Sequence, residues 1–292
     1  MAPGFRTALT ECRVGFIGLG LMGGSLALAL RDRCALVCGY DLDPDTIAQA
    51  LEREIISRPI ELTGDEVDLL ILAAPVSAIL DWLDRAPAIF SGNFHLLDLG
   101  STKAQITARM QLLPERISPL GGHPMCGKES SGLAMAERNL YEGCLFALTP
   151  LARTYPSTLQ VTQELIAAVS ARPLILDPAR HDRIAAAISH LPYALAVALM
   201  ETVSREADAT TWDMAASGFR DTSRLAASDV TMMLDIIRSN QAEVRQALGA
   251  AQAALQNLSD LIADQDWPSL RARLESAQAK RRWWEGLRRK EQ

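Results

Sequence analysis

Cysteine is scarce in this sequence, and its spacing is irregular. Only five cysteines occur among the 292 residues, at Cys12, Cys34, Cys38, Cys126 and Cys144. An odd number without a Cys-x-x-Cys pair does not form a disulfide framework and offers no set of zinc ligands. The pattern indicates reduced thiols in a cytoplasmic protein without a metal site.

Acidic residues outnumber basic ones, 35 to 29, and signals for a membrane are also lacking. The formal net charge is −6, which disfavours a nucleic-acid partner. Residues 14–30 carry no charge, but five of them are glycines and no basic segment of a signal peptide precedes them. We therefore expect neither a targeting segment nor a membrane partner.

Apolar residues are plentiful, at 49% of the chain. Short apolar runs at 14–18, 35–40, 68–74, 95–99 and 144–149 alternate with helical stretches, which predicts a parallel sheet with helices on both faces. Beyond about residue 178 only helical patterns follow. The predicted fold is α/β, with a Rossmann-type doubly wound sheet in residues 1–177 and an all-α domain in residues 178–292.

A glycine-rich turn follows the first apolar run. Gly18, Gly20 and Gly23 have the G-x-G-x-x-G spacing of a dinucleotide-binding βα turn, in which a pyrophosphate lies on the helix N-terminus. Asp41 ends the second apolar run, where such a motif places a carboxylate for the ribose hydroxyls. The cofactor contacts expected here are Gly18, Gly20, Leu21, Met22, Gly23 and Asp41.

Three further loops are candidates for the site, two after predicted strands and one after the segment Pro119-Leu120, because ligands bind beyond the carboxyl ends of strands in such sheets. They contain Ala74-Pro75, Leu99-Gly100-Ser101 and Gly121-Gly122-His123-Pro124, and all three are expected beside the nicotinamide end of the cofactor. A dehydrogenase needs a proton acceptor for the substrate hydroxyl, and a neutral imidazole suits that task.

His123 is the predicted catalytic group, because a loop dense in glycine and proline is unlike an apolar core. Ser101 could contact substrate or cofactor, or could belong to a helix cap, since Thr102 and Gln105 fit a capping box. Lys103 could support the cofactor site, but it is interpreted as an exposed first-turn lysine. Cys126 is interpreted as a residue of the pocket wall, since it lacks a nucleophile signature.

The helical half offers a second group of polar residues. His181, His190 and Tyr193 lie on a helix that Pro192 is expected to kink. A kink can turn these groups toward a cleft.

Two arginines follow on one predicted helical face. Arg220 and Arg224 could each hold a substrate carboxylate in a bidentate clasp, or could pair with Asp221 or Asp229. Further along, apolar residues between Val244 and Ile262 recur at spacings of four and three, which predicts a helix–helix seam.

Six segments occur in an order shared with a known enzyme family. They are Gly18–Ala27, Asp98–Lys103, Gly122–Gly127, Leu140–Gly143, Ser189–Pro192 and Gly218–Arg224. In this order they resemble the prephenate/arogenate (cyclohexadienyl) dehydrogenase family over nearly the whole chain. The resemblance implies NAD-dependent oxidative decarboxylation of prephenate to 4-hydroxyphenylpyruvate, or of arogenate to tyrosine. It also implies that the helical half forms a homodimer.

Residue roles carry over from this resemblance. His123 matches the histidine that accepts the proton of the C4 hydroxyl, and Ser101 matches the serine that shares that hydrogen bond. Arg224 matches the arginine that holds the ring carboxylate, and His181 aligns with a further active-site histidine. Where relatives have the sequence SHLPH, this chain has Tyr193 at the last position, and Met233 replaces a frequent tryptophan. Both residues are expected beside the substrate, so the resemblance leaves prephenate or arogenate preference open.

Alternative functions remain at this stage. A 3-hydroxyacid dehydrogenase of the 6-phosphogluconate dehydrogenase type shares the glycine-rich turn, but its interdomain-helix lysine has no counterpart between Pro178 and Met200. A dinucleotide-sensing regulator would not need His123, Ser101 and Arg224 together. A family member that acts on an amino-substituted prephenate analogue is compatible with the sequence.

Overall fold

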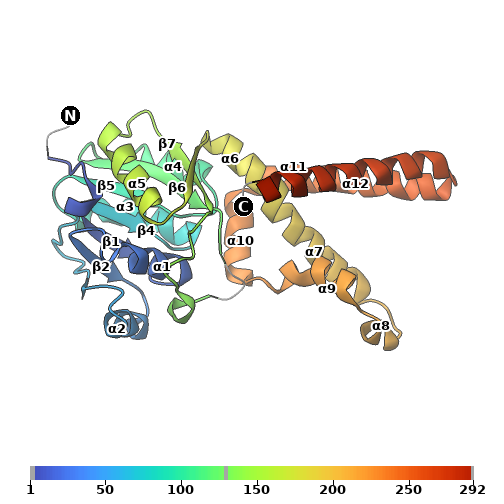
Figure 1. The fold of residues 1–292 in the computed structure, drawn as a ribbon, viewed down its shortest axis with the longest axis horizontal. Helices are drawn as coiled ribbons and strands as arrows, with labels where there is room; N and C mark the ends of the chain where they lie inside the picture. Colours follow the sequence, from blue (N-terminus) through green and yellow to red (C-terminus); the bar gives the residue numbers. More distant parts are fainter. Residues whose placement is uncertain (1–3, 128–130, 291–292) are drawn as a thin grey trace. The chain divides into compact units, whose positions relative to one another are not determined.

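An eight-stranded sheet forms the N-terminal part of the protein (Figure 1). The computed structural model describes residues 4–127 and 131–290. The strands are β1 (Arg13–Ile17), β2 (Leu36–Tyr40), β3 (Arg58–Pro59), β4 (Leu69–Leu72), β5 (Phe94–Asp98), β6 (Ile117–Pro124), β7 (Leu145–Pro150) and β8 (Arg172–Ile175). Their order is β3-β2-β1-β4-β5-β6-β7-β8, and its first six members have the Rossmann order 3-2-1-4-5-6. The predicted doubly wound sheet is confirmed.

The expectation of an all-parallel sheet is wrong at one edge. β7 pairs with β6 in the antiparallel direction, and β8 pairs with β7 in parallel. Parallel neighbours need a crossover, usually a helix, whereas residues 125–144 between β6 and β7 contain only the short 3₁₀ turn Leu133–Met135 among the described residues. The sequence patterns also missed β3, which has two residues, and β8, whose residues are all exposed.

Helices cover both faces of the sheet. They are α1 (Leu21–Leu30), α2 (Pro44–Glu52), α3 (Val76–Ile89), α4 (Ala104–Met110) and α5 (Pro156–Ala168). One apolar core contains buried residues of α1, α2 and α5, and a second contains buried residues of α3 and α4. Each core fills one face of the sheet, which is the layering expected from the sequence.

The glycine-rich turn between β1 and α1 is tightly packed. Gly18 has a φ of +91°, and a Cβ at this position would lie 2.3 Å from the carbonyl oxygen of Ala73. A Cβ on Gly23 would lie 2.0 Å from the carbonyl oxygen of Gly18. Only glycine fits both positions, as expected for a βα turn that brings a helix close to its strand.

A helical segment follows the sheet and packs against it. Its elements up to residue 240 are α6 (Pro178–Ala185), a π-helical turn (Ala186–His190), α7 (Leu191–Val203), α8 (Thr210–Asp213), α9 (Ser217–Ser223), the 3₁₀ turn η4 (Arg224–Ala227) and α10 (Val230–Ser239). The π turn directly precedes the Leu191-Pro192 step and provides the predicted irregularity. α10 is tied to α3, where the Ser77 backbone N–H donates to Asp235 at 2.9 Å.

The stretch Pro178–Val203 is long and apolar enough, by length and composition, to cross a membrane, and 22% of its most apolar window is buried. It also carries the buried residues His181, Asp182 and His190, of which His181 contacts His123 and Asp182 contacts the Lys103 backbone. Among the other apolar residues of this stretch, Ile184, Ile188 and Leu195 are exposed.

The chain divides into two compact units, Met1–Val244 and Arg245–Gln292. The second unit contains the greater part of α11 (Gln241–Ala263) and α12 (Trp267–Lys290), which pair through hydrogen bonds from Arg273 to Asn257 and to the Ala254 carbonyl. Its large apolar residues are largely exposed, including Leu255, Ile262, Trp267, Leu274 and Trp283. The last strand ends at Ile175 and α6 begins at Pro178, so the change from sheet to helices falls at the predicted boundary between residues 177 and 178. That this position divides two domains stays a prediction.

Candidate active site

Two histidines meet at the carboxyl end of β6. His123 Nδ1 lies 2.9 Å from His181 Nε2, and His181 Nδ1 lies 2.8 Å from Asp182 Oδ1. His181 and Asp182 are 3% and 2% exposed, so the second histidine and its carboxylate are out of solvent. The structure thus brings together His123 and His181, which the sequence placed in separate halves of the chain.

His123 lies on strand β6, so its predicted position in an open loop is wrong. The neighbouring glycines have a packing role instead of a turn role. A Cβ on Gly122 would lie 2.7 Å from the Asp98 carbonyl oxygen, and one on Gly121 would lie 2.1 Å from Thr149 Oγ1. These glycines let β6 pass close to its neighbours and place a partly buried His123 at the strand end.

The surroundings of His123 keep its imidazole neutral. Burial lowers its pKa well below the usual value, and the nearby His181, Lys103 and His190 lower it further when they are charged. A neutral ring has a lone pair, so His123 has the protonation state that a general base requires at neutral pH.

A buried ion pair supports the same strand end. Lys103 and Asp98 are both fully buried, and Lys103 Nζ donates to Asp98 and, at 2.6 Å, to the Gly122 carbonyl oxygen. Asp98 in turn accepts hydrogen bonds from the backbone N–H groups of Gly100 and Gly122. Burial raises the pKa of Asp98 and lowers that of Lys103, while their mutual attraction opposes both changes.

The interpretation of Lys103 as an exposed lysine is therefore wrong. The pair joins the turn that contains Ser101 to the backbone next to His123. Removing one partner of a buried pair typically costs about 3–5 kcal/mol, because the other charge is left without compensation. The Asp98–Lys103 pair thus links the turn of Ser101 to the strand end of His123 through the Gly122 carbonyl oxygen.

Ser101 lies half-buried in the turn between β5 and α4. The expected capping box is not formed, because Thr102 is buried and donates its hydroxyl to Ser239 Oγ at 2.9 Å. α4 begins at Ala104, and its first N–H groups are bound by Asp182 from α6. The capping interpretation of this turn is therefore wrong, and Ser101 remains available for the site.

The glycine-rich turn faces open space at one position. Apart from its two chain neighbours, no described residue has an atom within 4 Å of a Cβ built on Gly20, and α1 begins there without a side-chain cap. Leu21 is buried and Met22 is half-buried in the first turn of this helix, and Pro75 is the N-cap of α3 directly after Ala74. Asp41 Oδ2 accepts the Leu19 N–H at 2.8 Å, so this carboxylate is held against the turn.

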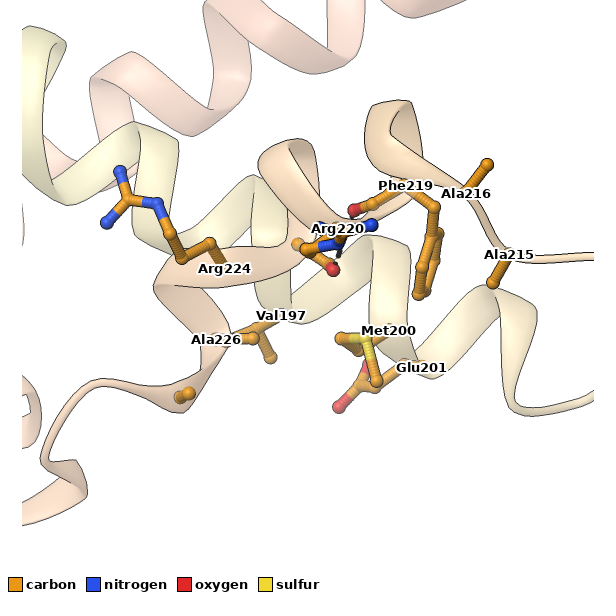
Figure 2. Close-up of a pocket in the computed structure, with 11 residues that line it drawn as sticks. Val197, Met200, Glu201, Ala215, Ala216, Phe219, Arg220, Arg224 and Ala226 are labelled. Carbon is orange, nitrogen blue, oxygen red and sulfur yellow. Dashed lines mark hydrogen bonds between the residues drawn. The ribbon is translucent and has the colours of Figure 1, made fainter. Parts of the chain in front are cut away.

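Arg224 lies in η4 and lines an open pocket of about 720 Å³ between α7, α9 and η4. Val197, Met200, Phe219 and Arg220 line the same pocket. Figure 2 shows the Arg224 guanidinium extending away from the Phe219 ring. Arg224 is exposed to solvent.

Comparisons with known proteins identify the family. Residues 26–175 match "Prephenate dehydrogenase, nucleotide-binding domain", and residues 177–276 match "Prephenate dehydrogenase, dimerization domain". This chain belongs to the prephenate dehydrogenase family. The predicted family is confirmed, and the 3-hydroxyacid dehydrogenase alternative is not favoured.

Named relatives agree with this assignment. A prephenate dehydrogenase of Bacillus subtilis is 32% identical over 78% of this chain, and the match spans 64% of that relative. A cyclohexadienyl dehydrogenase of Zymomonas mobilis is 28% identical over 87% of this chain and 89% of its own. The solved structure of an Aquifex aeolicus prephenate dehydrogenase, with hydroxyphenyl propionate and NAD⁺, superposes with a TM-score of 0.86 and 29% identity, covering 94% of this chain and 98% of that one.

The two residues that depart from the prephenate dehydrogenase pattern lie on different helices. Tyr193 is half-buried in the first turn of α7, just after the π turn. Met233 is 6% exposed on α10. Their contact with a substrate stays a prediction.

Sequence reasoning missed several polar residues of this site. Asn240 Nδ2 donates to the Asp182 carbonyl oxygen at 2.8 Å and lies 3.3 Å from His190 Nδ1. Asp98 and Asp182 were missed as well, and the burial of Lys103 was not expected, although Asp98 and Lys103 flank Ser101 in the chain. For Asp98 and Lys103 a signal was present in the sequence, because residues of opposite charge lie on either side of the candidate catalytic Ser101.

The buried histidines predict a pH-dependent stability. Burial lowers the pKa of His190 to about 4, against 6.5 for the exposed group, so the unfolded chain binds a proton first as the pH falls. The contribution of His190 is complete above pH 6.5 and is lost between there and about 4. Urea unfolding at several pH values should show this loss in wild type and a smaller one in His190→Gln. If the free energy of unfolding fell with pH by the same amount in both proteins, this role of His190 would be contradicted. The comparison uses the difference between the two proteins because other titrating groups such as Asp98 contribute equally to both.

Proposed function

We propose that this protein catalyses the oxidative decarboxylation of prephenate, arogenate or both with NAD, and that it serves tyrosine biosynthesis in the cytoplasm. The observation that carries the proposal is the neutral His123 imidazole at the end of β6, held by His181 and backed by the Asp98–Lys103 pair. This arrangement lies in a chain of the prephenate dehydrogenase family. The Aquifex aeolicus relative binds NAD⁺ and hydroxyphenyl propionate, which supports both ligand classes.

The glycine-rich turn fits a dinucleotide. The open space at Gly20 lets a pyrophosphate approach the backbone, and the uncapped first turn of α1 offers N–H groups to an anion. We assign the cofactor contacts to Gly18, Gly20, Leu21, Met22, Gly23, Asp41, Ala74, Pro75 and Ser101. When bound, NAD supplies the hydride acceptor.

The residues of this chain supply the proton chemistry and the substrate contacts. His123 Nε2 would accept the proton of the C4 hydroxyl while that carbon gives up a hydride, and Ser101 would share the hydrogen bond. The C1 carboxylate would then leave as carbon dioxide, its bonding electrons would make the ring aromatic, and the oxygen at C4 would take the proton back from His123. Arg224 would hold this carboxylate until it leaves, with Tyr193 and Met233 beside the substrate and His181 behind His123.

NAD is expected to be preferred over NADP. The Asp41 carboxylate lies at the turn, where it accepts hydrogen bonds from ribose hydroxyls and repels a 2′-phosphate. Leu42 follows, is 81% exposed and offers no compensating cation. Steady-state kinetics with both cofactors measure the preference. An equal or higher kcat/KM with NADP would contradict this role of Asp41.

We infer that both cyclohexadienols are substrates. Tyr193 can donate a hydrogen bond to a keto acid but carries no charge that selects for or against an amino group. The Zymomonas mobilis relative is a cyclohexadienyl dehydrogenase, which supports the broader activity. NADH formation with prephenate and with arogenate, measured side by side, should give comparable kcat/KM values. A ratio above about 10³, or more than about 4 kcal/mol, would show that a charged group discriminates between them.

We also propose that the helical part, residues 178–292, forms the homodimer. The match to a dimerization domain over residues 177–276 supports this. Large apolar side chains are exposed on several helices of this part, including Ile188 at 60%, Met214 at 82% and Val230 at 70%. A self-complementary partner surface would cover them.

A further inference from the structure

We propose that Asp182 is a positioning residue that sets the tautomer of His123 through His181. The three side chains form a continuous row from the buried carboxylate to the partly buried imidazole. The inference concerns the proton positions in the resting protein. Its catalytic value rests on the proposed function: the tautomer would leave a lone pair on His123 Nε2, the nitrogen proposed to accept the proton of the substrate hydroxyl.

The hydrogen-bond chemistry of the row permits one arrangement when both rings are neutral. A carboxylate only accepts, so His181 Nδ1 must carry the hydrogen shared with Asp182 Oδ1. His181 Nε2 then has the lone pair, and His123 Nδ1 must donate to it across 2.9 Å. His123 Nε2 is therefore left without a hydrogen, ready to accept a proton.

Asp182 is held so that it cannot turn away. Its Oδ1 accepts the Lys103 N–H at 2.7 Å, and its Oδ2 accepts the Ala104 N–H at 2.8 Å. These donors begin α4, so one carboxylate both caps this helix and orients His181. The same two bonds join the histidine row to the turn that carries Ser101.

Other charged groups around the row are already engaged. Lys103 Nζ is bound to Asp98 and the Gly122 carbonyl oxygen, and His190 Nδ1 lies against the Asn240 amide. Burial lowers the pKa of His190 to about 4, so it adds no charge at neutral pH. Among the described residues, Asp182 is thus the carboxylate hydrogen-bonded to this row, and it reaches His123 only through His181. When His123 takes up the substrate proton, this negative charge also stabilises the cation.

Nitrogen-15 NMR of the imidazoles tests the tautomers directly, because the chain has only four histidines. We expect both His123 and His181 to be protonated at Nδ1 at neutral pH. His95 gives an internal reference of the opposite kind, since its Nε2 lies 2.8 Å from the Arg6 carbonyl oxygen and must donate to it. In Asp182→Asn the tautomer of His123 should change or become mixed. A His123 ring protonated at Nε2 in wild type would overturn the proposal, whatever the enzyme's activity.

Kinetics of two variants separate positioning from helix capping. Asp182→Asn disturbs the cap of α4, but His181→Gln leaves it intact. Both should lower kcat by about 10² with KM changed less than about threefold, since a carboxylate-to-amide change in catalytic triads can cost about 10⁴ in kcat. The double variant should be no worse than either single one, because the two residues act as a unit.

Ser239→Ala is the matched control, since it removes a buried hydrogen bond to Thr102 outside the row. It should keep kcat within about threefold of wild type, as an independent site would. A His181→Gln variant with wild-type kcat would overturn the proposal. If wild type turns over neither cyclohexadienol but shows the expected tautomers, the proposed function fails and the positioning role stands.

Discussion

Replacing His123 with asparagine is expected to lower kcat by about 10² to 10⁴, because the change removes the general base but keeps a hydrogen-bonding side chain. Asparagine is smaller than histidine and polar, so strand β6 and the Asp98–Lys103 pair should stay in place. Steady-state kinetics with saturating NAD measure the loss. The wild-type rate should stay high at mildly acidic pH, because burial lowers the pKa of His123 and the ring stays neutral there.

Binding of NAD provides the control for this variant. Its Kd should change less than about threefold, since His123 is not among the proposed cofactor contacts. Nearly full activity of His123→Asn at neutral pH would contradict the assignment. His181, 2.9 Å away, would then be the next candidate for the base.

Arg224→Gln is expected to raise KM for either substrate by about 10² or more, because the bound substrate would exclude water from the pair of guanidinium and ring carboxylate, and losing one partner of a desolvated pair costs about 2–5 kcal/mol. Arg224 itself lies exposed on η4. Arg224→Lys should restore only part of the affinity, because an ammonium group cannot form the planar, bidentate contact. Affinity for NAD and the melting temperature should stay near the wild-type values.

Arg220→Gln is the matched control, because Arg220 lines the same pocket one helical turn earlier. It should leave KM nearly unchanged. If Arg224→Gln lowers the melting temperature and leaves KM unchanged, Arg224 is a structural residue. The ring carboxylate is then held by Arg220 or by a group of the partner subunit.

The sheet and its glycine-rich turn could be predicted because their signals are local. Gly18 and Gly23 are required by contacts within one βα unit, and the buried strands are continuous apolar runs. The antiparallel β7 could not be predicted, because direction depends on the connection and not on the strand's own residues. β6 was hidden by Gly121 and Gly122, which in isolation are typical of a turn.

The charged part of the site could not be predicted from sequence because its partners are far apart in the chain. Lys103 has the position of a solvated helix-start residue, and only the packing of β6 over it shows that it is buried. Asp182 caps a helix that begins 78 residues earlier, and no local pattern marks such a contact. The motif resemblance did indicate His123 and His181, but their direct contact is a property of the fold.

The most direct test of the proposed reaction is to measure NADH and carbon dioxide together as the purified protein turns over prephenate. Oxidative decarboxylation by this site predicts equal initial rates for the two products, together with an equivalent amount of 4-hydroxyphenylpyruvate. His123→Asn should lower all three rates by the same factor. NADH formed without carbon dioxide would indicate simple alcohol oxidation, and no NADH with either prephenate or arogenate would contradict the proposed activity altogether.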